Sequence, residues 1–388
     1  MKILVLSSHT PSLFWFRMEM MKTFLGLGHT VIAAAQESEL VWAERFREQG
    51  IEYRQVFVQR NGVNPLSDLK TLRELNSLMK EVKPDKVFVY QAKTIIYGAL
   101  AAAHNNIGEV YPLVAGLGSI FRGKGRKNKL LTEIVSIQYR LAFRRSRKVI
   151  FQNDDDMNNL LGRKLLKKTQ IEKINGSGVN LDKFLPAALP EEPAFLLIAR
   201  LIRDKGVMEY LEACKMLKSK YKNIRCMLVG PFDTNPSALK PEELDTFIAE
   251  GIIEYNGEQK DVRPYIEMCS TYVLPSYHEG TPKTVLEAMA MGRAIITTHA
   301  PGCKETVVDG ENGYLVDVKN VNQLVEKMEY LINNPDINRH MGIKSIKLVQ
   351  EKFDVKKINA EILRIMGLEE SYKVTKLQSY KKIVISNQ

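Results

Sequence analysis

Short apolar runs alternate with longer amphipathic stretches along the first half of the chain. The apolar runs predict strands at 2–7, 30–35, 53–58, 86–90, 110–114 and 148–152. Apolar residues at helical spacing between these runs predict helices at 18–27, 40–49, 68–81 and 95–103. Strands that alternate with helices in this way form a parallel sheet with helices on both faces.

The same alternation restarts after the proline-containing segment 184–193. The second half is expected to contain strands at 195–199, 225–229, 253–255, 271–274 and 294–297, with helices at 208–217, 284–291, 321–333 and beyond Asp354. The pattern therefore predicts an α/β fold of two doubly wound, Rossmann-like domains facing a central cleft. We expect an N-terminal domain at 1–183, a linker at 184–193, a C-terminal domain at 194–353, a C-terminal helix at 354–370 that packs back on the N-terminal domain, and a basic tail at 371–388.

Composition narrows the class of protein further. The chain has 388 residues, of which 45% are hydrophobic and 26% charged, as in ordinary globular proteins. The first apolar run is too short for a signal-peptide core, and no run approaches the length of a membrane span. All four cysteines lie in the second half without a Cys-x-x-Cys pair, which favours a reduced, cytoplasmic compartment. The net charge of +11 favours phosphates, nucleic acid or an anionic membrane as partners.

Much of the positive charge lies in the stretch from Arg122 to Lys148, which holds ten Lys or Arg residues and one acidic residue, Glu133. One helical face of this stretch is apolar and is formed by Leu130, Ile134, Ile137 and Leu141. A basic amphipathic helix suits the surface of an anionic bilayer, whereas a core helix with solvated basic ends is an equally good interpretation. Nucleic-acid binding is not expected, since no recognition motif is present.

The stretch from Leu274 to Met291 reads as a strand end, a loop and the start of a helix, with Thr281 as the expected N-cap and Pro282 in the first turn. Free N–H groups at such a helix start attract anions, and ligands of open α/β sheets collect at the carboxyl ends of strands. Glu279 in the loop and Glu287 on the helix could bind sugar hydroxyls. Two surface glutamates at a solvated helix start would have the same spacing.

Two further cations follow the first strand of the second half. Arg200 closes that strand, and Lys205 stands in the loop before the next helix. A diphosphate needs positive charge at two phosphoryl groups, and these cations would supply it if the sheet brings them to Glu279. Otherwise Arg200 is expected to form an ordinary surface pair with Asp204.

Three consecutive acidic residues, 154–156, suggest either an Asp-x-Asp metal site or the first turn of a helix. Acidic residues at a helix N-terminus complement the helix dipole, and the helix interpretation is preferred. No metal ion or other cofactor is expected.

The second half carries motifs that resemble those of the retaining glycosyltransferases of family 4. They are Ala199-Arg200, Lys205-Gly206, Val229-Gly230, 274–282, Glu287-Ala288, 292–295 and 310–316. In the first half, Ser8-His9, 16–18, Lys93, 115–119 and 178–180 resemble a bacterial subgroup that adds sugars to undecaprenyl-diphosphate-linked acceptors. The resemblance implies the two-domain GT-B architecture, with an acceptor-binding N-terminal domain and a nucleotide-sugar-binding C-terminal domain.

The resemblance also implies roles for individual residues of the C-terminal domain. Arg200 and Lys205 would hold the donor diphosphate, and with Glu279 they are the expected catalytic residues. Glu279 would bind the transferred sugar and Glu287 the ribose. The backbone at Gly280 and Thr281 would complete the phosphate site, and Glu258 would lie near the base.

Acceptor-binding residues are expected in the N-terminal domain, and they are His9, Phe16, Arg17, Lys93 and Gly118. Many family members have a histidine in the loop that here reads Gly116-Leu117-Gly118, so a histidine base is absent at that place. Transfer is then expected on the face from which the diphosphate departs, with the leaving group helping to deprotonate the acceptor.

The expected activity is transfer of a hexose or N-acetylhexosamine, such as N-acetylgalactosamine, from a UDP-sugar to an undecaprenyl-diphosphate-linked saccharide in bacterial glycan assembly. The enzyme would act as a peripheral protein on the inner face of the plasma membrane. Two other functions are compatible with the sequence: a nucleotide-sugar 2-epimerase, which needs no acceptor, and a non-catalytic basic protein that binds lipid or nucleic acid.

Overall fold

The computed structural model describes residues 1–59, 62, 64–117, 121, 125–234 and 237–369. Its chain divides into two compact units: unit 1 comprises Met1–Ile174 together with the chain from Ile358 onward, and unit 2 comprises Asn175–Lys357. Gly118, part of the basic stretch 122–148 and the tail 371–388 lie outside the described residues.

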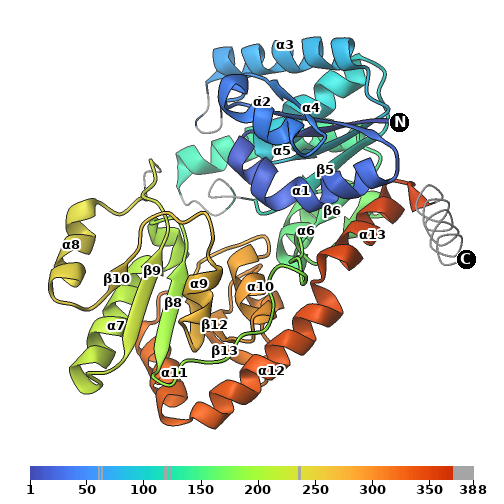
Figure 1. Ribbon diagram of the computed structural model, residues 1–388. Coiled ribbons are helices and arrows are strands. Elements are labelled where there is room, and N and C mark those ends of the chain that lie inside the picture. Colours follow the sequence, from blue (N-terminus) through green and yellow to red (C-terminus); the bar gives the residue numbers. More distant parts are fainter. Residues whose placement is uncertain (60–61, 63, 118–120, 122–124, 235–236, 370–388) are drawn as a thin grey trace, which may run out of the picture. The chain divides into compact units, whose positions relative to one another are not determined.

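Unit 1, whose residues up to Ile174 run from blue to green in Figure 1, is built on one parallel sheet with the strand order β3-β2-β1-β4-β5-β6-β7. The strands are β1 (Lys2–Leu6), β2 (Thr30–Ala35), β3 (Glu52–Gln55), β4 (Lys86–Tyr90), β5 (Val110–Val114), β6 (Val149–Phe151) and β7 (Ile171–Lys173). The helices are α1 (Thr10–Gly26), α2 (Glu39–Arg47), α3 (Pro65–Val82), α4 (Ala92–His104), α5 (Arg126–Arg144), α6 (Asp154–Gly162), the 3-10 turn η2 (Lys168–Gln170) and α13 (Val355–Ile365).

Both faces of this sheet are covered, which explains why its central strands are apolar throughout. Ile3 and Val5 of β1 point to the face where α1, α2 and α13 pack, whereas Leu4 and Leu6 point to the face covered by α3, α4, α5 and α6. The expected parallel sheet with helices on both faces is therefore confirmed. The acidic run Asp154–Asp156 forms the first turn of α6, and Asn153 is its N-cap, with Oδ1 accepting from Asp156 N at 2.8 Å.

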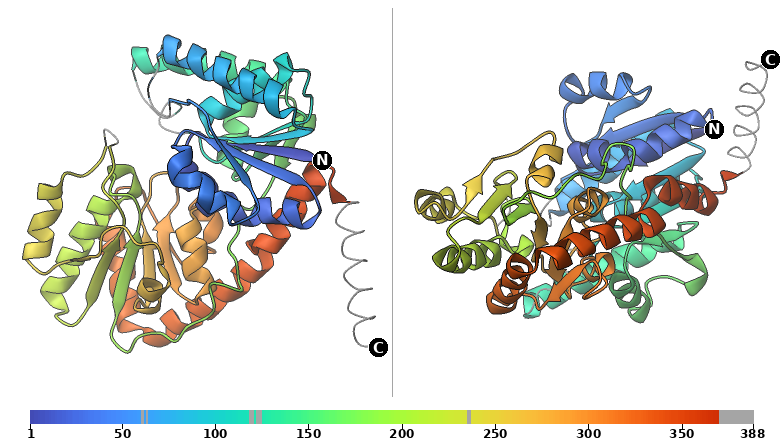
Figure 2. Two further views of the ribbon diagram at one scale, coloured as in Figure 1. Left: turned by 45° about the horizontal axis from the view of Figure 1, so that its top comes forward. Right: turned by 60° about the horizontal axis from the view of Figure 1, so that its bottom comes forward.

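Unit 2, coloured from green through yellow to red in Figure 2, is built on a second parallel sheet with the strand order β10-β9-β8-β11-β12-β13. Its strands are β8 (Ala194–Ile198), β9 (Arg225–Val229), β10 (Glu254–Tyr255), β11 (Thr271–Leu274), β12 (Ala294–Thr298) and β13 (Gly313–Val316). Its helical elements are η3 (Arg203–Lys205), α7 (Val207–Lys220), α8 (Pro241–Ala249), α9 (Arg263–Glu267), α10 (Lys283–Ala290), η4 (Lys304–Thr306), α11 (Val321–Asn333) and α12 (Pro335–Lys352). Within this unit α7 packs beside α11 and α10 packs beside α12.

The structure moves the expected domain boundaries. The chain first passes from unit 1 to unit 2 between Ile174 and Asn175 rather than at residue 183. Val179 is buried in the core of unit 2, and Phe184 packs against that core. The second crossing falls inside α13, after Lys357 rather than after residue 353. The residues of α13 from Ile358 onward are part of the unit 1 core. The segment 184–193 is held to unit 2, since Ala187 N donates to Met291 O at 3.2 Å.

Candidate active site

The predicted donor residues come together because β8 and β11 are neighbours in the sheet. The two strands pair in parallel, with Thr271 opposite Phe195. The loops that follow them, 199–206 and 275–282, therefore leave the same edge of the sheet side by side. This is the edge at which open α/β sheets bind ligands.

Lys205 and Glu279 form an ion pair between these two loops. Their side chains are 19% and 14% exposed, so the pair is shielded from most of the solvent. The backbone N–H of Glu279 also donates to Pro301 O at 2.9 Å, which fixes the residue from a third loop. The structure thus confirms that the cation and the carboxylate predicted from separate motifs lie in contact.

Close contacts between backbone atoms fix the positions of the two loops relative to each other. Gly206 has φ +71°, and a Cβ there would lie 2.1 Å from Pro275 O. Tyr277 N donates to Asp204 O at 2.9 Å. Gly302, with φ +80°, would place a Cβ 2.2 Å from Glu279 O, so only glycine permits this approach. The position of Glu279 is therefore determined by backbone contacts on both sides.

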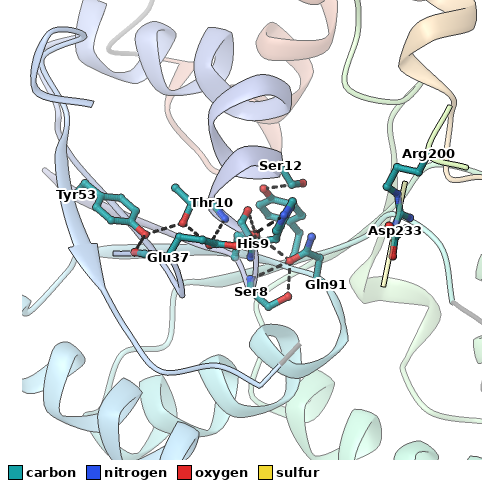
Figure 3. A network of polar contacts seen from close by, with 11 residues as sticks. Ser8, His9, Thr10, Ser12, Glu37, Tyr53, Gln91, Arg200 and Asp233 are labelled. Carbon is teal, nitrogen blue, oxygen red and sulfur yellow. Dashed lines mark hydrogen bonds and ion pairs between the residues drawn. The ribbon is translucent and has the colours of Figure 1, made fainter. Parts of the chain in front are cut away.

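Arg200 lies at the end of β8, and its carboxylate partner is Asp233 rather than Asp204. Arg200 Nη1 lies 2.6 Å from Asp233 Oδ2, and the two side chains are drawn together in Figure 3. Asp233 follows β9, the other neighbour of β8 in the sheet. Sequence reasoning missed Asp233, because no motif marks it and only the strand order brings it to Arg200.

Glu287 lies on α10 and is buried. Burial raises the pKa of Glu287, and the charge of Lys283, whose Nζ lies 3.6 Å away, partly opposes this rise. The start of α10 is anchored by Thr284, whose Oγ1 lies 2.7 Å from the hydroxyl of Tyr272. Glu287 is therefore a buried carboxylate close to Lys283, on a helix that begins at the edge of the sheet where ligands bind.

The expected N-cap of this helix was wrong. The helix begins at Lys283 with Pro282 as its N-cap, because Pro282 is extended (ψ 112°) and its carbonyl accepts from Val285 N at 3.2 Å. Thr281 instead bonds to Gly280 O at 3.0 Å. Gly280 and Thr281 thus belong to the loop that leads from Glu279 into the helix.

Glu258 lies apart from the Lys205–Glu279 pair, beyond β10 and two strands away from β8. It is exposed and lines a cavity of about 760 Å³ together with Asn256, Gln259, Lys260 and residues of α9. This cavity is at the carboxyl end of β10. It could accommodate a flat polar group at the same edge of the sheet.

The candidate acceptor residues of unit 1 gather around β1 and β4. His9 precedes α1, and its Nε2 lies 3.7 Å from Glu37 Oε1. Phe16 is exposed on α1, whereas Arg17, the next residue, is buried. Gly118 lies outside the described residues.

Two of these expected acceptor-binding residues are cations that the structure does not leave at the surface. Arg17 is not a cation at the surface, since it packs over the ring of Tyr90. Lys93 on α4 is not an available cation either, because its Nζ lies 2.6 Å from Asp68 Oδ1 in a pair that is largely shielded from solvent. Sequence reasoning also missed Gln91, which Figure 3 shows beside Ser8 and His9.

Comparison with known proteins agrees with this architecture. Residues 2–153 match the family model "Glycosyl transferase 4-like", and residues 182–348 match "Glycosyl transferases group 1". The N,N'-diacetylbacillosaminyl-diphospho-undecaprenol alpha-1,3-N-acetylgalactosaminyltransferase of Campylobacter jejuni is 31% identical over 88% of this chain and 92% of its own length. The capsular polysaccharide biosynthesis glycosyltransferase CapM of Staphylococcus aureus is 26% identical over 78% and 81%.

Solved structures share the fold. A glycosyltransferase from Rickettsia africae aligns with a TM-score of 0.74 at 21% identity, covering 96% of this chain and 98% of that one. HepE of Anabaena in complex with UDP aligns with a TM-score of 0.74 at 16% identity, covering 95% and 100%. The two sheets and their carboxyl-edge site define an enzyme of the GT-B class. The chain belongs to the family 4 glycosyltransferases.

Proposed function

We propose that this glycosyltransferase moves a hexose or N-acetylhexosamine, such as N-acetylgalactosamine, from a UDP-sugar to an undecaprenyl-diphosphate-linked saccharide, with retention of configuration. The observation that carries the proposal is the convergence of Arg200, Lys205 and Glu279 at one sheet edge. The Campylobacter relative, whose name specifies a diphospho-undecaprenol acceptor, supports the acceptor class. The UDP complex of HepE supports the nucleotide.

Arg200 and Lys205 would bind the two phosphoryl groups of the donor. Both cations are paired with carboxylates, so the diphosphate would compete with Asp233 for Arg200 and share Lys205 with Glu279. Phosphate oxygens can replace a carboxylate in such charge-assisted bonds. Glu279 would accept hydrogen bonds from the hydroxyls of the sugar.

The remaining donor contacts follow from the order of the strands. The buried carboxylate of Glu287 would accept hydrogen bonds from the ribose hydroxyls. The N–H groups at Gly280 and Thr281, before α10, would face a phosphate, and the cavity beside Glu258 would take the base. His9, Phe16, Arg17 and Gly118 are our candidates for binding the acceptor.

The chemistry proposed is attack by an acceptor hydroxyl on the face from which the diphosphate departs, with a diphosphate oxygen taking the proton. Lys205 and Arg200 would stabilise the charge on the leaving group, so that no metal ion is needed. Glu279 would position the sugar. In the described residues, no group of three or more His, Cys, Asp or Glu side chains is placed to hold a metal ion.

The test is release of nucleoside diphosphate from a panel of UDP- and GDP-sugars, with membranes that carry polyprenyl-linked saccharides and with EDTA present. We expect release that requires the acceptor, survives EDTA and selects one UDP-sugar, with an α-linked product from an α-linked donor. Conversion of the sugar without acceptor would indicate an epimerase, and no release from any donor would indicate a binding protein. Either result would overturn the proposal.

We further propose that α5 rests on an anionic membrane surface, on the inner face of the plasma membrane. Its four outward apolar side chains, at 130, 134, 137 and 141, are 44–66% exposed, while Val135 and Phe143 on its other face are buried in unit 1. Lys129 and Arg144 are exposed on the same helix. Among the described helices none is long and apolar enough to cross a bilayer.

Replacing Ile134 and Ile137 together with glutamate should weaken binding to phosphatidylglycerol vesicles about tenfold or more. Each change removes apolar surface from the interface and adds negative charge there. Vesicle co-sedimentation measures the effect. Ile343→Glu on α12 is the matched control, since Ile343 is 58% exposed in unit 2. Equal binding by the double variant, or an equal loss in the control, would contradict a role for α5.

A further inference from the structure

Arg17 is a buried arginine without a carboxylate. Its side chain is 3% exposed, and its guanidinium carbon lies 4.9 Å from the centre of the Tyr90 ring. Nε has no hydrogen-bond partner, and among the described residues no acidic side chain pairs with Arg17. Burial without a counter-charge lowers the pKa of Arg17 and disfavours its charged form.

A second buried arginine shows that this arrangement is not general in the molecule. Arg293 is fully buried and donates to five backbone carbonyls, those of Ala187, Ala188, Ile266, Glu267 and Met291. Its hydrogen-bonding capacity is satisfied within the protein. The partner of Arg17 must come from elsewhere if its buried charge is to be compensated.

Arg17 lies where the winding of the sheet reverses. Strands β1 and β4 are neighbours, yet α1, which follows β1, packs on one face of the sheet, and α4, which follows β4, packs on the other. A crevice opens between the carboxyl ends of two such strands, and ligands of doubly wound folds bind there. Tyr90, under the Arg17 guanidinium, is the last residue of β4.

Gln91, the next residue, is bonded through its side-chain oxygen to the two serines that follow β1. Its Oε1 accepts from Ser8 N at 2.8 Å, Ser8 Oγ at 2.6 Å and Ser7 Oγ at 2.9 Å (Figure 3). Because a backbone N–H can only donate, the amide oxygen must face the serines. Its Nε2 then faces away from them and has no hydrogen-bond partner within the described residues.

The backbone at Gln91 supports a functional role for this side chain. Its φ is +74°, a region that residues other than glycine rarely occupy. It is the N-cap of α4 but does not cap the helix with its side chain. Glu37, which follows β2 and contacts the start of α1, is already engaged, since Oε2 accepts from Thr10 N and Oγ1 at 2.6 Å each.

We propose that Arg17 and Gln91 form a phosphate-binding site in unit 1 that receives a phosphoryl group of the acceptor. The inference rests on the proposed function for the identity of the acceptor, whereas the anion site itself follows from unit 1 alone. Arg17 supplies the charge and Gln91 Nε2 a fixed donor, while Lys93 stays paired with Asp68. The ligand chemistry is that of a diphosphate, either lipid-linked or free.

The test compares Arg17→Met and Gln91→Glu with the unmodified chain in binding inorganic pyrophosphate, measured by calorimetry. Gln91→Glu keeps an oxygen facing the serines and puts a negative charge where the amide donor stood. We expect two classes of pyrophosphate site in the wild-type chain. Arg200→Met should remove one class, and each unit 1 variant should remove or weaken the other about tenfold to a hundredfold. Lys22→Met, an exposed cation on the same helix, is the matched control.

Two further readouts separate binding from a structural role. The melting temperature of Arg17→Met should equal or exceed that of the wild type, because an uncompensated buried charge is removed. In turnover, both variants should raise KM for the polyprenyl-linked acceptor about tenfold, with KM for the donor unchanged. Pyrophosphate binding that is unchanged in both variants would overturn the site. Loss of that binding, in a chain that transfers no sugar, would support the site and reject the acceptor assignment.

Discussion

Replacing Lys205 with methionine should reduce kcat/KM for the donor by about 10²- to 10³-fold. Lys205 is a largely shielded cation in contact with Glu279. Without it, the departing diphosphate would lose one of its two proposed charge partners, and the Glu279 carboxylate, which is 14% exposed, would lose this cation. Initial rates of nucleoside diphosphate release over a range of donor concentrations measure the effect.

The matched control is Lys215→Met on α7. Lys215 pairs with Glu250 at 2.9 Å, but both side chains are about half exposed. Exposed pairs contribute little to stability, and this one lies on a helix away from the loops of the site. Its turnover should equal that of the wild type. Turnover within twofold of the wild type for Lys205→Met would reject the assigned role.

Replacing Arg293 with methionine should destabilise unit 2 by about 3–5 kcal/mol. The five carbonyls that its guanidinium satisfies would lose their donor inside the protein. Arg293→Lys should not restore stability, since an ammonium cannot reproduce the planar fork of donors. Denaturant unfolding followed by far-UV circular dichroism measures the change.

Fluorescence gives a built-in comparison for this prediction. Both tryptophans of the chain, Trp15 and Trp42, lie in unit 1, so their emission reports on that unit. The tryptophan transition should shift less than the circular dichroism transition. Arg225→Met, which removes an exposed pair with Glu254, should cost less than about 1 kcal/mol. A similarly small loss for Arg293→Met would show that its carbonyls find other donors.

The central strands could be predicted from sequence because both faces of each sheet are covered. β4 and β5 match the predicted ranges 86–90 and 110–114, since every residue in them is buried and, after Lys86, every residue is apolar. α12 could not be predicted in the same way. Its buried face includes Asn338, Gly342 and Ser345, and Asn338 bonds to Thr271 Oγ1 at 2.9 Å. Because small and polar residues occupy part of this buried face, the sequence of α12 does not show apolar residues at a regular helical spacing.

The residues of the candidate site also differ in whether the sequence could predict them. Lys205 and Glu279 could be predicted because each follows a strand, and the order of the strands decides whether they meet. Asp233 in unit 2 and Gln91 in unit 1 could not be predicted, because their contacts depend on strand order and backbone conformation rather than on local pattern. The burial of Arg17 could not be predicted either.

The path of the chain has a consequence for synthesis on the ribosome. Unit 2 is complete once Lys357 has emerged, whereas unit 1 needs the side chains of Ile358, Ile362 and Leu363 to finish its core. Domains generally fold as units during translation. The first 174 residues of unit 1 therefore cannot complete their fold until the segment from Ile358 onward has been synthesised. The nascent chain should therefore carry an unfinished, chaperone-dependent unit 1 while unit 2 already resists proteases.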